Sequence, residues 1–239
     1  MTGASDPVSP GGYRPTMPPA DAERIRRWHE QAYEDAREDF GTTRTFGYLG
    51  TTIRVPAGVM PITSMSYVLG DAVRAEVSHG ESVLDMGTGS GVNAILAARG
   101  GADVVAVDVS EVALEAAREN ADRNDVGHAI EIRRSDLFVA VPEAFDLIVF
   151  DPPYRWFTPR DALEAAMTDE NYEALTRFFR EARSHLRARG RMLVSFATSG
   201  DLGYLRALAA AARFTEEVVG RAEVERDGVR VEYVAFRLT

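Results

Sequence analysis

An apolar segment, "FDLIVF" at residues 145–150, is followed directly by Asp151, Pro152, Pro153 and Tyr154. Folding alone does not require an acid, two prolines and an aromatic ring at the end of a buried strand. The Asp151 carboxylate and the Pro152 carbonyl are acceptors, and the prolines fix the backbone without adding N–H donors. The Tyr154 ring offers a flat apolar face. The pattern suits a site that holds the N–H groups of a planar ligand, and a proline-terminated strand with a capping Asp is the alternative.

A second candidate site is the segment "VLDMGTGSGVNAI" at residues 83–95, which contains Asp85, Gly87, Thr88, Gly89 and Gly91. Its pattern predicts a strand, a tight turn and a helix. Glycine permits positive φ and lets the backbone approach a ligand, so this geometry is typical of nucleotide-like ligands. The G-x-G-x-x-G spacing of dinucleotide-binding proteins is absent, because valine follows the last glycine. A tight strand–helix connection without a ligand is the alternative.

Two further acids lie at the ends of predicted strands. Asp108 ends the next strand, 17 residues beyond Gly91, where an acid commonly accepts hydrogen bonds from ribose hydroxyls. Asp136 follows the third strand. Ligands of open α/β sheets bind at the carboxyl ends of the strands, so the sequence predicts one site there. Each acid also has a simpler interpretation, because Asp108 is able to cap the following helix and Asp136 is able to lie in a solvated loop.

These residues have to be positioned by the strands and helices that alternate from about residue 81 onward. Strand-like segments occur at 82–87, 103–110, 129–136, 145–154 and 191–197, with helix-like segments at 91–100, 111–124, 170–190 and 200–214. Such alternation predicts a parallel sheet covered on both faces. Segments 215–224 and 229–238, around "RDG", predict an antiparallel hairpin. We therefore predict an α/β, Rossmann-like, doubly wound, mostly parallel seven-stranded sheet with an antiparallel C-terminal hairpin.

The chain before residue 81 has a different character. Residues 1–20 are rich in Pro, Gly and Ser, which predicts a disordered lead-in. Residues 21–40 predict a polar amphipathic helix, 45–62 extended structure and 64–79 a further helix. We expect residues 21–80 to form a helical and extended cap on a domain at 81–239, and the helix around Trp28 to be able to cover the site.

Composition limits the classes of function. The formal net charge is −10, and all 27 basic residues are arginines, so a large nucleic-acid footprint is disfavoured. The chain has no cysteine, and its four histidines have no metal-ligand spacing, so we expect no metal. No apolar run approaches the roughly 20 residues of a membrane span. We expect a cytoplasmic protein without a membrane partner, and its oligomeric state is not predicted.

The glycine turn, Asp108, Asp136 and "DPPY", in that order, resemble the class I S-adenosylmethionine-dependent methyltransferases over about residues 81–239. The resemblance implies a methyltransferase that uses S-adenosyl-L-methionine and releases S-adenosyl-L-homocysteine. It also implies which residues contact the cofactor. The glycine turn would line the methionine part, and Asp108 would bind the ribose hydroxyls. Asp136 would contact the adenine amine, and Leu137 would pack on the adenine ring. The implied cofactor-binding set is Asp85, Gly87, Thr88, Gly89, Gly91, Asp108, Val109, Asp136, Leu137 and Asp151.

"DPPY" is similar to the [Asn/Asp]-Pro-Pro-[Tyr/Phe] motif of methyltransferases that modify nitrogen on a planar group. The resemblance implies that Asp151, Pro152 and Tyr154 are catalytic. They would direct the nitrogen lone pair by position and orientation rather than by strong base catalysis. Asp151 would also accept a proton from an amine or stabilise positive charge on the nitrogen.

The segment before the glycine turn resembles the HemK/PrmC-like branch, or methyltransferase small domain, at Gly58, Val59, Pro61 and residues 66–69. Met65 stands where that branch has an acid, and Asp151 stands where its glutamine methyltransferases have Asn. Both departures argue against release-factor glutamine as the substrate.

The segment after the motif supplies candidate substrate contacts. Tyr154, Arg155, Trp156 and Phe157 are predicted to bind substrate, and the arginines there are able to pair with a carboxylate or phosphate. A loop that packs its aromatic rings on the domain is an equal alternative. The sequence favours N-methylation of a small-molecule amine or a protein side chain. The alternative is an RNA or DNA base methyltransferase, and a non-catalytic cofactor-binding module is the third hypothesis.

Overall fold

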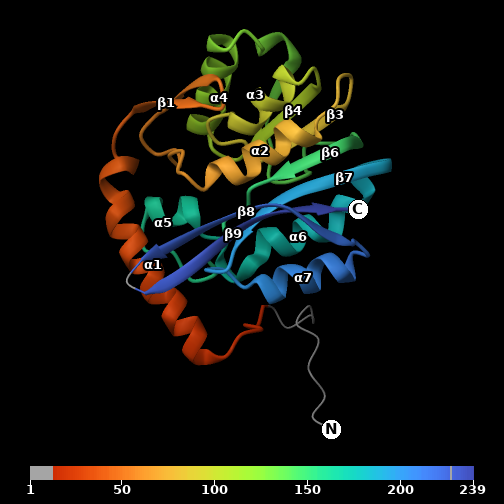
Figure 1. Ribbon diagram of the computed structural model, residues 1–239. Coiled ribbons are helices and arrows are strands. Elements are labelled where there is room, and N and C mark those ends of the chain that lie inside the picture. Colours follow the sequence, from red (N-terminus) through yellow and green to blue (C-terminus); the bar gives the residue numbers. More distant parts are fainter. Residues whose placement is uncertain (1–12, 227) are drawn as a thin grey trace.

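The computed structural model describes residues 13–226 and 228–239. In this described part, seven strands form one sheet in the order β5-β4-β3-β6-β7-β9-β8 (Figure 1). Strands β3, β4, β5, β6 and β7 are parallel, whereas β9 pairs antiparallel with β7 and β8 pairs antiparallel with β9. The predicted fold class is therefore confirmed, including the C-terminal hairpin. The strands are β3 (Ser82–Met86), β4 (Asp103–Asp108), β5 (Ile130–Arg134), β6 (Phe145–Phe150), β7 (Leu186–Ala197), β8 (Glu216–Arg226) and β9 (Val229–Leu238).

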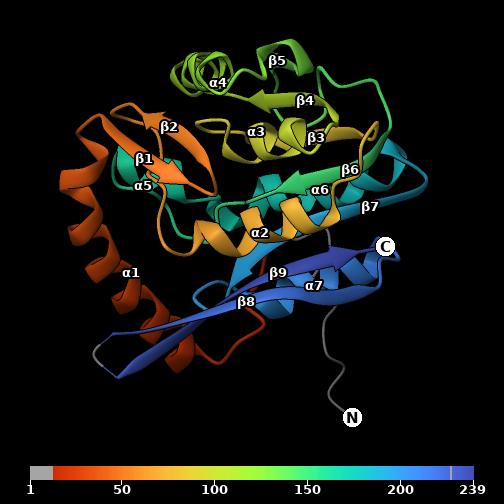
Figure 2. The same ribbon diagram turned by 45° about the horizontal axis from the view of Figure 1, so that its top comes forward.

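Helices cover both faces of the sheet (Figure 2). One apolar cluster joins α2 (Ser66–Glu76), α3 (Val92–Arg99) and α4 (Glu111–Arg123) to side chains such as Val83, Leu147 and Leu193. The opposite cluster joins α6 (Glu173–Ala182) and α7 (Leu202–Ala211) to the alternate side chains of the same strands. Successive strand residues point to opposite faces, so a strand buried on both sides is apolar throughout, as β6 is apart from one acid. Short helices lie at α5 (Ala162–Met167), η1 (Gly127–Ala129), η2 (Glu170–Tyr172) and η3 (Arg183–His185).

The N-terminal part lies along the carboxyl edge of the sheet. Helix α1 (Pro19–Phe40) runs beside α5 and the tip of the β8–β9 hairpin, and β1 (Arg44–Tyr48) pairs antiparallel with β2 (Thr51–Val55) (Figures 1 and 2). Trp28 of α1 is buried against Ala197 and Val231. None of the described helices combines the length and apolar character needed to cross a membrane.

The expected disordered lead-in falls partly outside the described residues, which begin at residue 13. Tyr13 donates a 3.0 Å hydrogen bond to Asp201, and the backbone N–H of Thr16 donates a 2.7 Å bond to the same carboxylate. Helix α1 begins at Pro19, inside the range 1–20. Residues 13–20 are thus attached to the body of the protein by polar contacts and the start of a helix.

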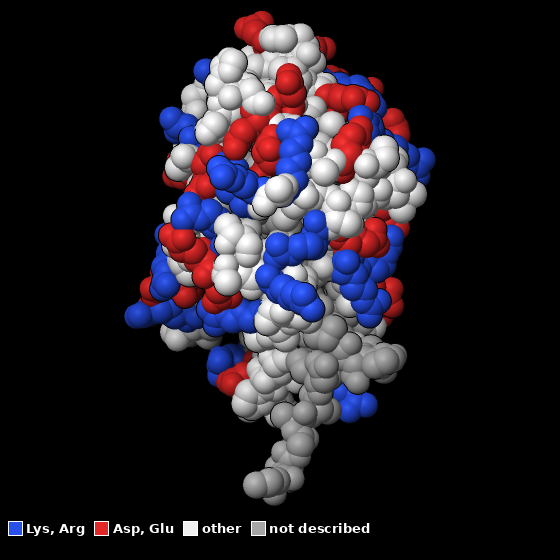
Figure 3. All heavy atoms as spheres, turned by 90° about the vertical axis from the view of Figure 1, so that its right-hand side faces the viewer, with Lys and Arg blue, Asp and Glu red and all other residues white. Residues whose placement is uncertain are grey.

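The single long helix expected at 170–190 is wrong. Helix α6 ends at Ala182, and β7 begins at Leu186. Arg187 pairs with Asp146 of β6 at 2.6 Å, and Arg191 pairs with Glu76 and Glu81 at 3.0 and 2.9 Å. Ion pairs to distant elements therefore draw the arginine-rich segment into the sheet. The side of the molecule away from α1 carries arginine and acidic side chains interspersed (Figure 3).

Candidate active site

The glycine turn connects β3 to α3. The backbone φ of Gly89 is +55°, and a Cβ built there would meet nothing within 4 Å, so the turn is open on that side. Gly91 has φ +85° and begins α3; a Cβ there would lie 3.1 Å from the Cα of Ala117 on α4. Positive φ is costly for other residues, so the turn needs glycine at both positions. One glycine faces open space, and the other permits close packing of the helices.

Asp85 lies beneath this turn. It is 1% exposed, and its Oδ2 accepts hydrogen bonds from Thr88 Oγ1 at 2.6 Å and from the Ala94 N–H at 3.0 Å. Burial raises the pKa of Asp85 to about 7, although both hydrogen bonds oppose that rise. The side chain fixes the turn to the first residues of α3. In a cofactor site it would act by holding the turn in shape.

Asp108 ends β4 beside the same turn. Its Oδ2 accepts a 2.9 Å hydrogen bond from the Gly89 N–H, and its Oδ1 accepts a 2.9 Å bond from the Ser110 N–H. The next residue, Val109, is 58% exposed, an unusual position for a valine that follows a buried strand. A half-exposed carboxylate and an exposed apolar side chain therefore lie together at the open side of the glycine turn.

Asp136 and Leu137 follow β5. Asp136 is exposed and accepts a 2.9 Å ion-paired hydrogen bond from Arg177 of α6. Leu137 has φ +50° and is 8% exposed, with its side chain in the core cluster of α6 and α7. In the structure, Asp136 lies at the expected edge of the sheet. It is ion-paired with Arg177, a partner that the sequence did not predict.

Asp151 follows β6 directly. Phe150 pairs with Met86 of β3 on one side and with Val194 of β7 on the other, so Asp151 lies between the glycine turn and Ser195. Ser195 donates a hydrogen bond from Oγ to Asp151 Oδ1. Protein surrounds the carboxylate, and this desolvation raises the pKa of Asp151, while the Ser195 bond lowers it. Asp151 is nevertheless accessible to solvent, so it lies at the carboxyl edge of the sheet and not in the core.

Tyr154 is held on several sides. Its hydroxyl lies 3.4 Å from the Tyr233 hydroxyl of β9, and its carbonyl accepts a 2.7 Å hydrogen bond from Tyr172. The ring centroid lies 5.9 Å from that of His29 on α1 and 6.1 Å from that of Phe196. Burial raises the pKa of Tyr154 well above its ordinary value, so the hydroxyl stays neutral. The ring is therefore fixed beside Asp151, with α1 supplying part of its surroundings.

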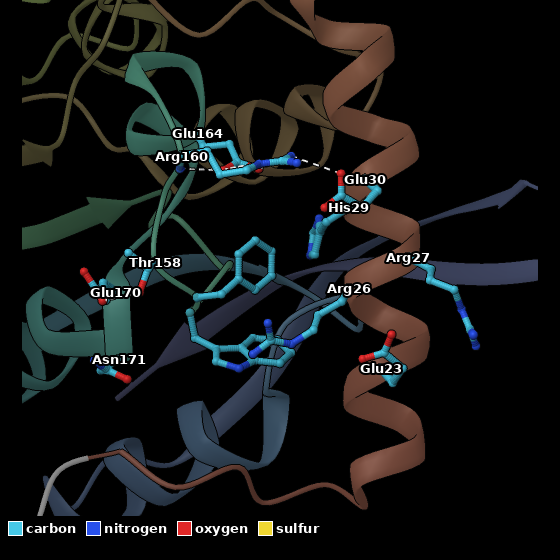
Figure 4. A pocket seen from close by; sticks show the side chains of 12 residues that line it. Glu23, Arg26, Arg27, His29, Glu30, Thr158, Arg160, Glu164, Glu170 and Asn171 are labelled. Carbon is cyan, nitrogen blue, oxygen red and sulfur yellow. Dashed lines mark hydrogen bonds and ion pairs between the residues drawn. The ribbon is translucent and has the colours of Figure 1, made fainter.

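The four residues predicted to bind substrate differ in their exposure. Tyr154 and Phe157 are partly buried, whereas Arg155 and Trp156 are each 4% exposed. Arg160 pairs with Glu164 at 2.6 Å and with Glu30 of α1 at 3.0 Å (Figure 4). The aromatic residues pack on the domain, as the alternative interpretation expected. Arg155 is also buried, but among the described residues it has no ion-pair partner comparable to those of Arg160.

Sequence reasoning missed three residues of this site. Ser195 is the only hydroxyl residue in the apolar run "MLVSFA", and that isolated hydroxyl was a usable signal. Tyr233 reaches Tyr154 because β9 pairs with β7, placing Ala197 opposite Tyr233. His29, one of the four histidines without metal-ligand spacing, is 3% exposed and contacts the Tyr154 and Phe157 rings. No local pattern distinguishes these last two from ordinary aromatic residues.

The residues at the carboxyl edge fit an adenosine-containing cofactor. The open glycine turn, the Asp108 carboxylate and exposed Val109 adjoin one another, and Asp151 follows the neighbouring strand. β3 lies between β4 and β6, where the order of strands reverses, which is the ligand position in open α/β sheets. The fold and this arrangement are those of a Rossmann-like α/β domain whose ligand edge suits a nucleoside-containing cofactor.

The sequence matches the methyltransferase small domain over residues 64–224. This range is more than half of the chain, and the chain belongs to that family. The expected similarity to the HemK/PrmC-like branch is confirmed. A release factor glutamine methyltransferase of Cereibacter sphaeroides is 39% identical over 128 residues, which cover 47% of this chain and 45% of the relative. The chain thus spans less than half the length of that relative.

Solved structures share the fold. A ribosomal protein L11 methylase of Lactobacillus delbrueckii subsp. bulgaricus superposes with a TM-score of 0.55 at 23% identity, covering 73% of this chain and 78% of that one. The 16S rRNA N2 G1207 methyltransferase of T. thermophilus, solved with AdoMet and guanosine, gives 0.59 at 21% identity, covering 82% and 49%. At this identity the two structures support the fold, while their substrates differ from each other.

Proposed function

We propose that this enzyme transfers a methyl group from S-adenosyl-L-methionine to an amine or amide nitrogen of a small molecule or protein side chain. The observation that carries the proposal is the Ser195-held carboxylate of Asp151, exposed to solvent beside the fixed Tyr154 ring. A hydrogen-bond acceptor in this position suits an N–H group of the substrate. An oxygen or carbon substrate atom would leave the Asp-Pro-Pro-Tyr motif unexplained.

The cofactor would be held by the open turn at Gly89, by Asp108 through the ribose hydroxyls and by Val109 against the adenine. Asp136 would contribute at the adenine amine while paired with Arg177, and Leu137 would pack nearby. When bound, the cofactor supplies an electrophilic methyl group on a sulfonium. Asp85 and Thr88 would hold the turn rather than contact the ligand, because the Asp85 carboxylate is buried and bonded to Thr88.

Asp151 and the Pro152 carbonyl would accept hydrogen bonds from the N–H groups of the nitrogen that receives the methyl group. These bonds would orient the nitrogen lone pair toward the methyl group. The Ser195 hydroxyl fixes the rotamer of Asp151, which reduces the reorganisation needed when a substrate binds. Asp151 Oδ2 is then available for the proton that the nitrogen loses on methylation. Tyr154 would support a planar acceptor from one side, because its neutral ring is held by Tyr172 and Tyr233.

A nucleobase acceptor is the second candidate, because Asp-Pro-Pro-Tyr also suits an exocyclic amine. A basic rim around Tyr154 would favour it. The neighbouring recess beside α1, which is lined by Trp156 and Phe157, is mixed in charge, and its Arg160 is already paired with acids. The charged residues that line this recess are Arg26, Arg27 and Arg160 with Glu23, Glu30, Glu164 and Glu170. Together with the net charge of −10, this balance favours the non-nucleic-acid substrate.

The test uses methyl-labelled S-adenosylmethionine in a host lysate that is then separated into protein, nucleic acid and small molecules. Asp151→Ala is the control, and S-adenosylhomocysteine binding is measured for both proteins. Label in the protein or small-molecule fraction that disappears with Asp151→Ala supports the proposal. Label in nucleic acid establishes the second candidate. A protein that binds no cofactor would overturn the proposed function.

A further inference from the structure

Arg155 is a buried cation without a hydrogen-bond acceptor. It follows Tyr154 directly and is 4% exposed. Within the described part of the chain, its Nη1 has no hydrogen-bond partner. An arginine side chain carries five N–H donors and a permanent charge, so a buried guanidinium is normally paired with carboxylates or carbonyls. This one is an exception that calls for an acceptor from outside the chain.

The nearest buried acids are already engaged. Glu164 interacts with Arg155 through charge, but its two oxygens accept bonds of 2.6 and 3.0 Å from the Arg160 guanidinium and 2.7 Å from the Arg160 N–H. Asp169, whose N–H donates to the Arg155 carbonyl, accepts 2.9 and 2.8 Å bonds from the first N–H groups of α6. Both oxygens of Glu164 are thus bonded to Arg160, and neither acid accepts a hydrogen bond from the Arg155 guanidinium.

Three more unpartnered polar atoms belong to residues connected with Arg155, directly or through His29. They are His29 Nδ1, Thr168 Oγ1 and Ser199 Oγ, and with Arg155 Nη1 they are the buried unpartnered side-chain atoms found among the described residues. His29 Nε2 donates a 2.7 Å bond to the Ser199 carbonyl, and Arg155 and Thr168 form a backbone bridge. Buried polar atoms are rarely left unpaired, so four in one region indicate a missing polar group.

A recess of about 600 Å³ lies between α1 and the segment after "DPPY", and His29 is the member of this cluster that lines it. His29 points from α1 toward this segment, with Glu164 and Arg160 on the opposite wall (Figure 4). His29 also interacts electrostatically with Arg155, and burial together with the Arg155 charge lowers the pKa of His29 to about 3. The imidazole is therefore neutral, and the Arg155 guanidinium lies close enough to this wall of the recess to interact with it by charge.

We propose that Arg155 binds a carboxylate of the substrate, so that the methyl acceptor is a small amine that also carries a carboxylate group. This inference rests on the proposed function. A carboxylate is planar, carries one charge and matches the guanidinium geometry. A phosphate monoester would bring nearly two charges, more than the one charge that the Arg155 guanidinium carries. A nucleic-acid backbone is disfavoured, because Arg155 is 4% exposed.

The first test compares the thermal stability of Arg155→Met and Arg160→Met, measured as Tm without ligand. Removing an unpaired buried charge relieves a desolvation cost, so we expect Arg155→Met to melt at or above the wild-type temperature. Arg160→Met is the matched control from the same segment. It leaves buried Glu164 without its cation, so we expect its Tm to fall by several degrees, on the order of 5 °C. Loss of stability in Arg155→Met equal to that in Arg160→Met would overturn the proposal, since Arg155 would then be structural.

Ligand binding provides the second test, with acetate as the probe and chloride at equal ionic strength as the reference. At about ten times its Kd, acetate is expected to raise the wild-type Tm by about 3–6 °C and to leave Arg155→Met unchanged. Absence of the wild-type shift, or its persistence in Arg155→Met, contradicts carboxylate binding at Arg155. A larger shift with inorganic phosphate than with acetate also contradicts it.

S-adenosylhomocysteine is added to the same proteins in parallel. A Tm rise with this ligand, in wild type and Arg155→Met alike, shows that the cofactor site is intact whatever acetate does. If that rise is missing while the acetate shift is present, the proposed methyltransferase function fails and the carboxylate site stands. The two proposals therefore fail in different measurements.

Discussion

Ser195 of β7 donates a hydrogen bond to Asp151, the first residue beyond β6, across a sequence separation of 44 residues. The parallel register of the two strands, in which Phe150 pairs with Val194, puts the hydroxyl and the carboxylate side by side. Burial raises the pKa of Asp151, and the Ser195 bond opposes that rise. The serine therefore has two effects, since it orients the acid and favours its ionised form.

Ser195→Ala should lower kcat/KM by roughly 10- to 100-fold, the range for a lost hydrogen bond to a charged group. Without the hydroxyl the pKa of Asp151 rises further. Because the proposed site needs the ionised acid, the acidic limb of the pH–kcat/KM profile should move to higher pH. Ser184→Ala, which removes an exposed hydroxyl bonded to the Glu181 carbonyl, is the matched control. An acidic limb that stays in place in Ser195→Ala would contradict this role.

The variants Asp151→Asn and Asp151→Ala separate the effect of hydrogen-bond orientation from the effect of the negative charge at this position. The asparagine keeps one acceptor oxygen in the same place, so we expect it to lose about tenfold in kcat, whereas alanine should lose about a hundredfold or more. Both variants should bind S-adenosylhomocysteine as the wild type does, which isothermal calorimetry measures. Equal loss in the two variants would show that the charge of Asp151 outweighs its hydrogen-bonding geometry.

Gly89→Ala tests the open side of the glycine turn. A Cβ at Gly89 meets nothing within 4 Å, and the same holds at Gly58, where φ is also positive. Both substitutions to alanine should therefore cost a similar free energy of unfolding, about 1–2 kcal/mol from backbone strain. The Gly89 variant alone should lose affinity for S-adenosylhomocysteine, by roughly tenfold or more, because its methyl group would occupy the ligand side of the turn. Unchanged affinity would place the cofactor elsewhere.

Asp85→Asn tests the buried acid under the turn through pH-dependent stability. The pKa of Asp85 is raised from 3.8 to about 7 in the folded protein. A raised folded pKa contributes stability that is fully present below the unfolded value and is lost as the pH rises through about 7. Asparagine keeps the acceptor for Thr88 and Ala94 but does not ionise. The stability of Asp85→Asn relative to wild type should therefore increase between about pH 4 and 7.

Urea unfolding at several pH values measures this difference. Asp103→Asn, at an exposed acid that begins β4, is the control and should show no comparable trend. A difference between Asp85→Asn and wild type that stays constant across the pH range would show that Asp85 remains ionised in the folded state.

The order of the strands, the covering helices and the closing hairpin followed from sequence, because buried strands on both faces are apolar and glycine turns interrupt them at regular intervals. The boundary between α6 and β7 did not follow. The segment at 183–191 has the composition of a helix end, but Arg187 and Arg191 bind acids on β6, on α2 and before β3. Such partners lie far away in the sequence, so local propensity does not report them.

The sequence by itself determined the Rossmann-like class, the cofactor turn and the acid at the end of β6, since short-range patterns encode all three. Tertiary structure alone decided which polar groups are satisfied. Arg155 and Arg160 are equivalent in the sequence, yet Arg160 is paired with Glu164, and Arg155 Nη1 has no partner among the described residues. His29 reaches the Ser199 carbonyl across 170 residues, and Tyr233 reaches Tyr154 across 79. Hydrogen-bond satisfaction and burial depend on contacts between distant segments, and these exist only once the chain has folded.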